Sequence, residues 1–192
     1  TAAEAAGCVT KTKAVGRGDW TGELLRMGMR EYARACSMSG LALHGGVIPA
    51  CGTFFVCSDY RKPAIRLAAL MRLHVVYIWT HDSFRVGEDG PTHQPIEQEA
   101  QIRLMEHLHN HRGERSMVVL RPADGAETVA AWKLAIEEER PVALILSRQN
   151  IKDLPGDRRK AAKKLHKGAY VVTDAEPPDG LLIAHGSALS TR

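Results

Sequence analysis

Residues 80–95 read THDSFRVGEDGPTHQP, and this stretch carries more titratable side chains than a connecting loop needs. Imidazole groups bind anions and move protons near neutral pH, and carboxylates contact hydroxyl groups. The glycines and the proline within GEDGP favour a fixed turn over a regular element. We therefore expect a functional loop, whose chemistry would come from His81, Asp82, Glu88, Asp89 and His93.

The elements that must position this loop follow from hydrophobic periodicity. Apolar runs of strand type alternate with helical patterns, and the segment before the loop, VVYIWT, is β-branched and aromatic throughout. Ser58 is a candidate N-cap, and Pro95 suits the first turn of a helix. We expect helices over 28–46, 58–74, 95–109 and 127–139, strands over 47–55, 75–80 and 141–149, and a strand followed by a turn over 116–124.

Such alternation indicates an α/β fold with a mostly parallel sheet that helices cover on both faces. In these sheets, ligands bind outside the carboxyl ends of the strands. That rule brings three segments to one edge: the loop after VVYIWT, the RPAD turn after SMVVL and the SRQN turn after VALIL.

Composition sets further bounds. The 192 residues are 44% hydrophobic and 25% charged, as in an ordinary globular domain, and no long apolar run suggests a membrane span. The four cysteines form no C-x-x-C pair, which favours free thiols in an intracellular protein. The basic run DRRKAAKKLHK (157–167) lacks an aromatic residue for base stacking, so we interpret it as a solvated linker or helix face. Nucleic-acid binding is a distant third hypothesis.

The loop and its surroundings resemble the pyrimidine-binding middle domain of transketolase. The match runs through GTFF, SDY, PAIRLAAL, THDS, GEDGPTHQPIE, LRPAD and LSRQN, in the family's order, over about 16–156. KGAYVV resembles the start of the family's carboxy-terminal domain. We therefore expect a pyrimidine-binding domain over 1–156, a basic linker over 157–168 and a truncated carboxy-terminal domain over 169–192. The missing initiator Met suggests that the chain begins partway through a longer protein.

The resemblance implies an activity and its cofactors. Transketolases transfer a two-carbon ketol unit between ketose and aldose phosphates in the pentose phosphate pathway, in the cytoplasm. They use thiamine diphosphate and a divalent metal, Mg²⁺ or Ca²⁺, at the interface of a homodimer. The diphosphate and the metal are held by the amino-terminal domain, which this chain lacks. The expected partners are therefore sugar phosphates and a diphosphate-binding domain, with no metal ligand in this chain.

The resemblance also assigns residues to the cofactor. Glu31, in GMREYAR, matches the glutamate that hydrogen-bonds the aminopyrimidine ring and promotes its catalytic tautomer. Met29 matches an apolar contact to the same ring. Phe54 and Tyr60 match aromatic residues around it, and Cys57 stands where a second phenylalanine is common. Tyr32 replaces the usual His or Phe.

Four further residues match the substrate side of the family's site. His81 and Arg148 match positions that bind the terminal phosphate of the sugar, Asp89 one that contacts a substrate hydroxyl, and His93 a histidine near the reacting carbons. His107, His109 and His111 alternate across a helix end, so they would point in different directions and favour no metal site.

The amino-terminal edge departs from the family pattern. Glu4, Cys8 and Val9 replace the aspartate, the phosphate-binding serine and the asparagine of the family's S-A-D-L-x-x-S-N segment. Two classes of function therefore compete: half of a composite transketolase site, or a non-catalytic remnant that binds a partner or a phosphorylated ligand. In either class we expect no turnover by the isolated chain.

Overall fold

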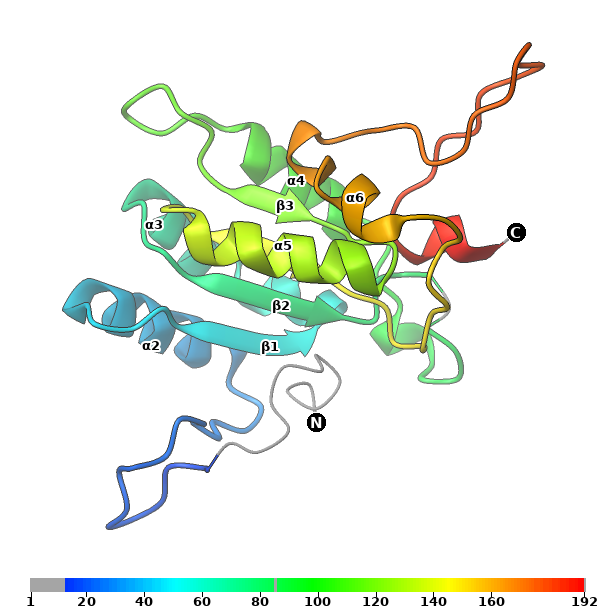
Figure 1. The fold of residues 1–192 in the computed structure, drawn as a ribbon. Coiled ribbons are helices and arrows are strands. Elements are labelled where there is room, and N and C mark those ends of the chain that lie inside the picture. The colour runs from blue at the N-terminus through cyan, green and yellow to red at the C-terminus, as the bar shows by residue number, and fades with distance from the viewer. Residues whose placement is uncertain (1–12, 85, 192) are drawn as a thin grey trace.

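The computed structural model describes residues 13–84 and 86–191. One sheet of four parallel strands forms the centre of the molecule, with the strand order β1-β2-β4-β3 (Figure 1). The strands are β1 (Ala50–Phe54), β2 (Val76–Thr80), β3 (Val118–Leu120) and β4 (Val142–Ile145). The predicted α/β architecture with a parallel sheet is confirmed.

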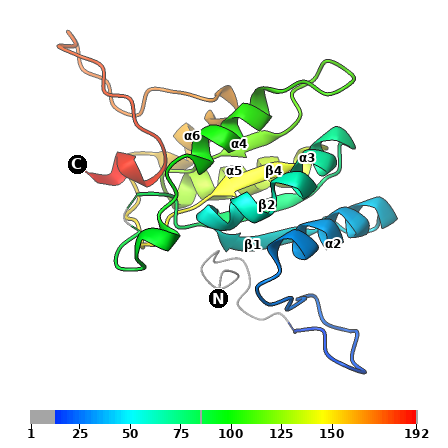
Figure 2. The ribbon, with the colours of Figure 1, turned by 180° about the vertical axis from the view of Figure 1, so that it is seen from behind.

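Helices cover both faces of the sheet, as Figures 1 and 2 show from opposite sides. On one face lie α2 (Glu31–His44), α3 (Lys62–Leu70) and α4 (Gln98–His107), and on the other lies α5 (Gly125–Glu137). β2 and β4 are buried along their whole length, which explains why their sequences are continuously apolar. The larger core lies under α2, α3 and α4, and the smaller under α5.

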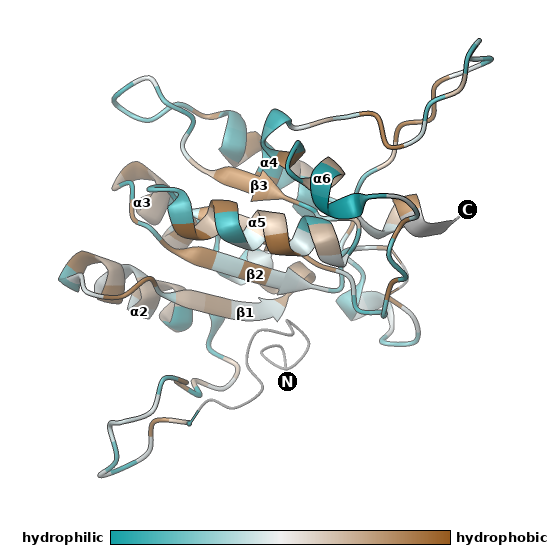
Figure 3. Cartoon of the chain, in the orientation of Figure 1, coloured by the Kyte–Doolittle hydropathy of each residue, from teal (hydrophilic) through white to brown (hydrophobic). Residues whose placement is uncertain are grey.

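The basic stretch forms a short helix, α6 (Arg158–Ala162), followed by the 3₁₀ helix η3 (Leu165–Lys167), and α6 is strongly hydrophilic in Figure 3. Arg158 nevertheless differs from the solvated side chains expected there. Its Nε lies 2.7 Å from Oδ2 of Asp124, the N-cap of α5, and its Nη2 lies 3.0 Å from Oε1 of Glu127. The stretch is therefore tied to the sheet domain by a buried ion-pair network, which Tyr170 joins.

Two predicted helix starts are wrong. Ser58 lies inside a 3₁₀ helix, η1 (Phe55–Tyr60), and α3 begins only after Arg61, without a side-chain cap. Pro95 precedes α4 by three residues, because the chain still runs through irregular backbone at that point. In both places the segment before the α-helix is longer than sequence propensity suggests, and the helix begins later.

The loop between β2 and α4 spans residues 81–97 and contains one 3₁₀ turn, η2 (Pro91–His93). The apolar runs 169–172 and 181–184 form no helix or strand within the described chain, and the last element is the 3₁₀ helix η4 (Gly186–Thr191). Among the described residues, no helix is both long and apolar enough to cross a membrane.

Candidate active site at the carboxyl edge of the sheet

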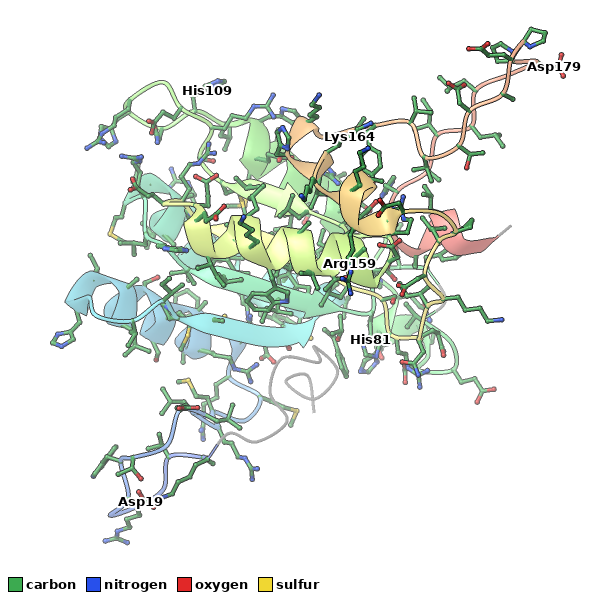
Figure 4. All side chains as sticks on the ribbon, in the orientation of Figure 1. Asp19, His81, His109, Arg159, Lys164 and Asp179 are labelled. Carbon is green, nitrogen blue, oxygen red and sulfur yellow. The ribbon has the colours of Figure 1, made fainter. Side chains whose placement is uncertain are left out.

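Three neighbouring strands deliver side chains to one edge of the sheet. Phe54 ends β1, His81 directly follows β2, and Arg148 lies three residues beyond β4. Because β1, β2 and β4 are adjacent and parallel, their carboxyl ends meet, and the rings of Phe54 and His81 pack at a tilt with centroids 4.0 Å apart. The edge predicted from the strand pattern therefore carries the predicted residues; Figure 4 labels His81 at this edge.

Asp89 contacts both His81 and Arg148 at this edge. Its Oδ2 lies 3.3 Å from Nε2 of His81 and 2.8 Å from Nε of Arg148. This oxygen is shut off from solvent and is held by the charges around it, without a well-aligned hydrogen bond. The arrangement places a carboxylate oxygen between an imidazole and a guanidinium, two groups that can bind an anion.

His81 is held neutral by its surroundings. Burial lowers the pKa of its imidazole, and Arg148 and His93 lower it further, while Asp89 opposes them. Its Nδ1 lies 2.9 Å from Oγ1 of Thr80, so Nε2 is the nitrogen directed at Asp89. A dianionic ligand in place of Asp89 would raise this pKa and favour the charged imidazolium.

His93 reaches the same edge from η2. Its ring meets Phe54 edge to face, with centroids 5.3 Å apart, and its Nδ1 lies 2.9 Å from Oγ1 of Thr92. Gly87 and Gly90 adopt φ values of 84° and 85°, so the loop uses backbone that glycine adopts without strain. The loop thus brings both His81 and His93 to the ring of Phe54.

A second group lies around the start of α2. Glu31 occupies the first turn of this helix, half-buried, and it makes no hydrogen bond or ion pair within residues 13–84 and 86–191. Burial raises the pKa of the Cys57 thiol, and the negative charge of Glu31 raises it further. Arg34 fixes the helix start, because its guanidinium donates to the carbonyl oxygens of Gly52, at 2.7 Å, and Gly28.

The remaining predicted cofactor residues lie on open surface. Met29 is 95% exposed and Tyr60 is 66% exposed. An unpaired carboxyl group, a thiol and a half-buried aromatic face suit a flat, nitrogen-containing ring such as an aminopyrimidine. Within the described chain, no cluster of three His, Cys, Asp or Glu side chains could hold a metal ion. The residues present therefore fit the ring of thiamine diphosphate, but they do not fit its metal.

His107 and His109 are not part of this group of residues. His107 ends α4 and His109 follows it, and Figure 4 shows His109 in a different region of the molecule from His81. Glu4, Cys8 and Val9 lie outside the described residues.

The sequence pattern assigns no functional role to the residues that surround Asp82. This aspartate is 1% exposed, and it pairs with Arg121, which follows β3, and with Ser187, which lies 105 residues later in the chain. The sequence pattern predicts that the RPAD turn lies at this edge, and this prediction includes Arg121. Nothing in the local pattern around Ser187 pointed to the contact.

Comparison with known proteins places the chain in a class. The family model described as "Transketolase, pyrimidine binding domain" matches residues 1–153. A transketolase of Halalkalibacterium halodurans is 52% identical over 176 residues, which are 91% of this chain and 25% of that protein. The chain therefore spans about a quarter of the length of this curated relative.

Solved structures agree with the sequence match. A Pichia stipitis transketolase, described as a complex with xylulose-5-phosphate, has a TM-score of 0.76 and 37% identity over 88% of this chain and 24% of its own. A structure described as a split-gene transketolase, an inactive β4 tetramer, has a TM-score of 0.53 and 32% identity over 68% of this chain and 38% of its own.

The fold and the family match thus define the class of this chain as a transketolase-type pyrimidine-binding domain. The chain belongs to the transketolase pyrimidine-binding domain family.

Proposed function

We propose that this chain supplies the aminopyrimidine and substrate side of a transketolase active site, for the transfer of a two-carbon unit between ketose and aldose phosphates. The observation that carries this proposal is the cluster of Phe54, His81, Asp89 and Arg148, with the Asp89 carboxylate between an imidazole and a guanidinium. It is supported by the family match and by the xylulose-5-phosphate complex described for the Pichia stipitis relative.

Each side chain has a part in this proposal. The Glu31 carboxyl, which is free of other partners in the described chain, hydrogen-bonds a nitrogen of the aminopyrimidine and shares a proton with it. Phe54 and Tyr60 pack against the ring, with Met29 and Cys57 beside it. When bound, thiamine diphosphate supplies the carbon nucleophile that takes up the two-carbon unit.

The loop between β2 and α4 handles the sugar phosphate. His81 and Arg148 bind the terminal phosphate, and Asp89 then turns to accept a hydrogen bond from a substrate hydroxyl. His93, on the other side of Phe54, holds a proton at a substrate oxygen near the reacting carbons.

The isolated chain should not turn over, because its described residues offer no metal site and the family places the diphosphate in another domain. The complete site would need a partner that carries a diphosphate-binding domain with its metal, Mg²⁺ or Ca²⁺, in a dimeric assembly. The relative described as an inactive split-gene β4 tetramer supports this division of labour.

The test is complementation. The purified chain would be assayed with thiamine diphosphate, Mg²⁺, a ketose phosphate and an aldose phosphate, alone and with a transketolase diphosphate-binding domain. We expect ketol transfer only in the mixture, and a loss of at least about 100-fold in Glu31→Gln. Glu137→Gln, on an exposed position of α5, is the matched control.

Three results would count against the proposal. Turnover by the chain alone would contradict the need for a partner, and full activity of Glu31→Gln would contradict the role of that carboxyl. A mixture that forms a complex, binds cofactor by circular dichroism and still shows no transfer would favour a non-catalytic remnant.

A further inference from the structure

The backbone that presents His81 is strained. His81 has a φ of 66° and Ser83 a φ of 73°, although neither is glycine. Left-handed backbone at a residue with a Cβ costs about 1–3 kcal/mol, and it persists only where the surroundings enforce it. Something must therefore hold residues 81–83 in this shape, and the residue between the two strained positions, Asp82, is the one that is most firmly held.

Arg121 grips Asp82 at both its backbone and its side chain. Nη2 of Arg121 lies 2.8 Å from the carbonyl oxygen of Asp82 and 3.1 Å from its Oδ2, and Nε lies 3.3 Å from the same Oδ2. Both side chains are almost fully buried, with 6% and 1% of their surface exposed. A planar guanidinium that binds a carbonyl and a carboxylate together fixes the orientation of the whole peptide, and so the direction of the adjacent His81.

The segment at 185–187 completes this arrangement from the far end of the chain. Ser187 Oγ donates to Oδ2 of Asp82 at 3.0 Å, and Nη1 of Arg121 lies 3.0 Å from Nδ1 of His185. Gly186 lies so close to Arg121 that a Cβ there would come within 2.7 Å of its Cγ and Nε. Glu99, on α4, binds the same nitrogen of Arg121, with Oε2 2.6 Å from Nη1.

We propose that Asp82, Arg121 and Ser187 are positioning residues that hold the imidazole of His81 toward the anion site, so that the segment at 185–187 is part of the site's architecture. The effect of this positioning on catalysis rests on the proposed function, because phosphate binding by His81 is part of that function. The conformational part does not, since it concerns where the imidazole lies.

The position of His81 can be measured without turnover. The centroid of its ring lies 4.0 Å from that of Phe54, so its Hε1 and Cε1 signals carry a ring-current shift that depends on the relative position of the two rings. In a ¹³C-labelled chain, His81→Gln identifies the signal by its loss. We expect Arg121→Lys and Ser187→Ala to move the His81 signals toward the values of a solvent-exposed histidine, and to weaken the binding of inorganic phosphate about three- to tenfold.

Matched controls separate positioning from general stability. Arg103 also pairs with Glu99, at 3.5 Å, but does not contact Asp82, so Arg103→Lys should leave the His81 signals in place. Ser116 is a buried serine whose Oγ donates to the carbonyl oxygen of Met105, so Ser116→Ala should shift stability without moving His81.

The outcomes are distinct. Folded Arg121→Lys and Ser187→Ala chains with unchanged His81 signals would overturn the proposal. If Arg121→Lys does not fold, Ser187→Ala alone decides, because it removes only a hydroxyl group. If the His81 signals move but the unmodified chain binds no phosphate, the positioning role stands and the phosphate role of His81 fails.

Discussion

Arg148 and Asp89 form an ion pair across the edge of the sheet, with Nε 2.8 Å from Oδ2, and the same oxygen lies 3.3 Å from Nε2 of His81. The chain thus places its own carboxylate between the two groups that suit a phosphate. An incoming anion must replace this carboxylate or share its partners. In the proposed function, Asp89 is therefore an internal competitor of the substrate phosphate.

The first prediction concerns this competition. Asp89→Asn removes the negative charge from between His81 and Arg148, so the isolated chain should bind inorganic phosphate more tightly, by about three- to tenfold. Isothermal titration at low and high salt would measure the change, which should shrink as salt screens it. Glu88→Gln is the control, because this neighbour is exposed and pairs with neither group among the described residues. Unchanged or weaker binding by Asp89→Asn would show that Asp89 does not compete.

The second prediction concerns pH. The folded pKa of His81 lies below its ordinary value of 6.5, chiefly because of burial, so the unfolded chain takes up the proton first as pH falls. The free energy of unfolding should therefore decrease below about pH 6.5, until pH passes the folded pKa. His81→Gln should flatten part of this decrease in urea titrations at a series of pH values. His185, whose pKa burial also lowers, supplies a second part, so His185→Gln is the comparison. An identical pH profile for His81→Gln and the unmodified chain would refute the assignment.

The third prediction concerns Cys57. A thiol at this position leaves one wall of the ring site without an aromatic side chain, and an added ring contributes about 0.5–1.5 kcal/mol. Cys57→Phe should therefore tighten the binding of thiamine diphosphate to the complemented assembly by about two- to tenfold. Cys36→Phe adds the same ring at an exposed position of α2 and should not change affinity. A loss of affinity in Cys57→Phe would mean that the thiol, or the space it leaves, is needed.

The fourth prediction concerns stability. Arg158 is buried against Asp124 and Glu127, and removing it leaves two carboxylates unpaired at the start of α5. Arg158→Ala should lower the free energy of unfolding by about 3–5 kcal/mol, whereas Arg159→Ala, at an exposed neighbour, should change it by less than about 0.5 kcal/mol. Denaturant titration of both variants gives the comparison. Equal effects would place Arg158 in solvent.

The same network links residues of different segments to one another. Tyr170 also donates to Glu127, and burial, with this neighbour, raises the pKa of its phenol to about 12. The phenol hydroxyl of Tyr170 therefore stays protonated at pH values near neutrality. The tie between the basic stretch and the sheet domain should therefore not depend on pH near neutrality.

The sequence by itself determined the class of fold and the edge at which the site lies. Strands such as VVYIWT and VALIL are apolar on both faces, and that pattern requires helices on both sides and a parallel sheet. In such a sheet, the residues that follow the strands share one edge, which is why the sequence alone predicts that His81 and Arg148 lie together. Local propensity was less informative at Ser58 and Pro95, where a 3₁₀ helix and irregular backbone precede the α-helices.

Only the tertiary structure decided which of these residues touch and in what state they are held. The contact of Asp82 with Arg121 and Ser187 joins segments 39 and 105 residues apart, and no periodicity encodes such a separation. The neutral state of His81 likewise depends on burial and on charges that different elements bring to it. The hydrophobic pattern of a helix or strand follows from the geometry of that one element. Side-chain contacts and protonation states depend on distances between elements, and these distances exist only in the folded molecule.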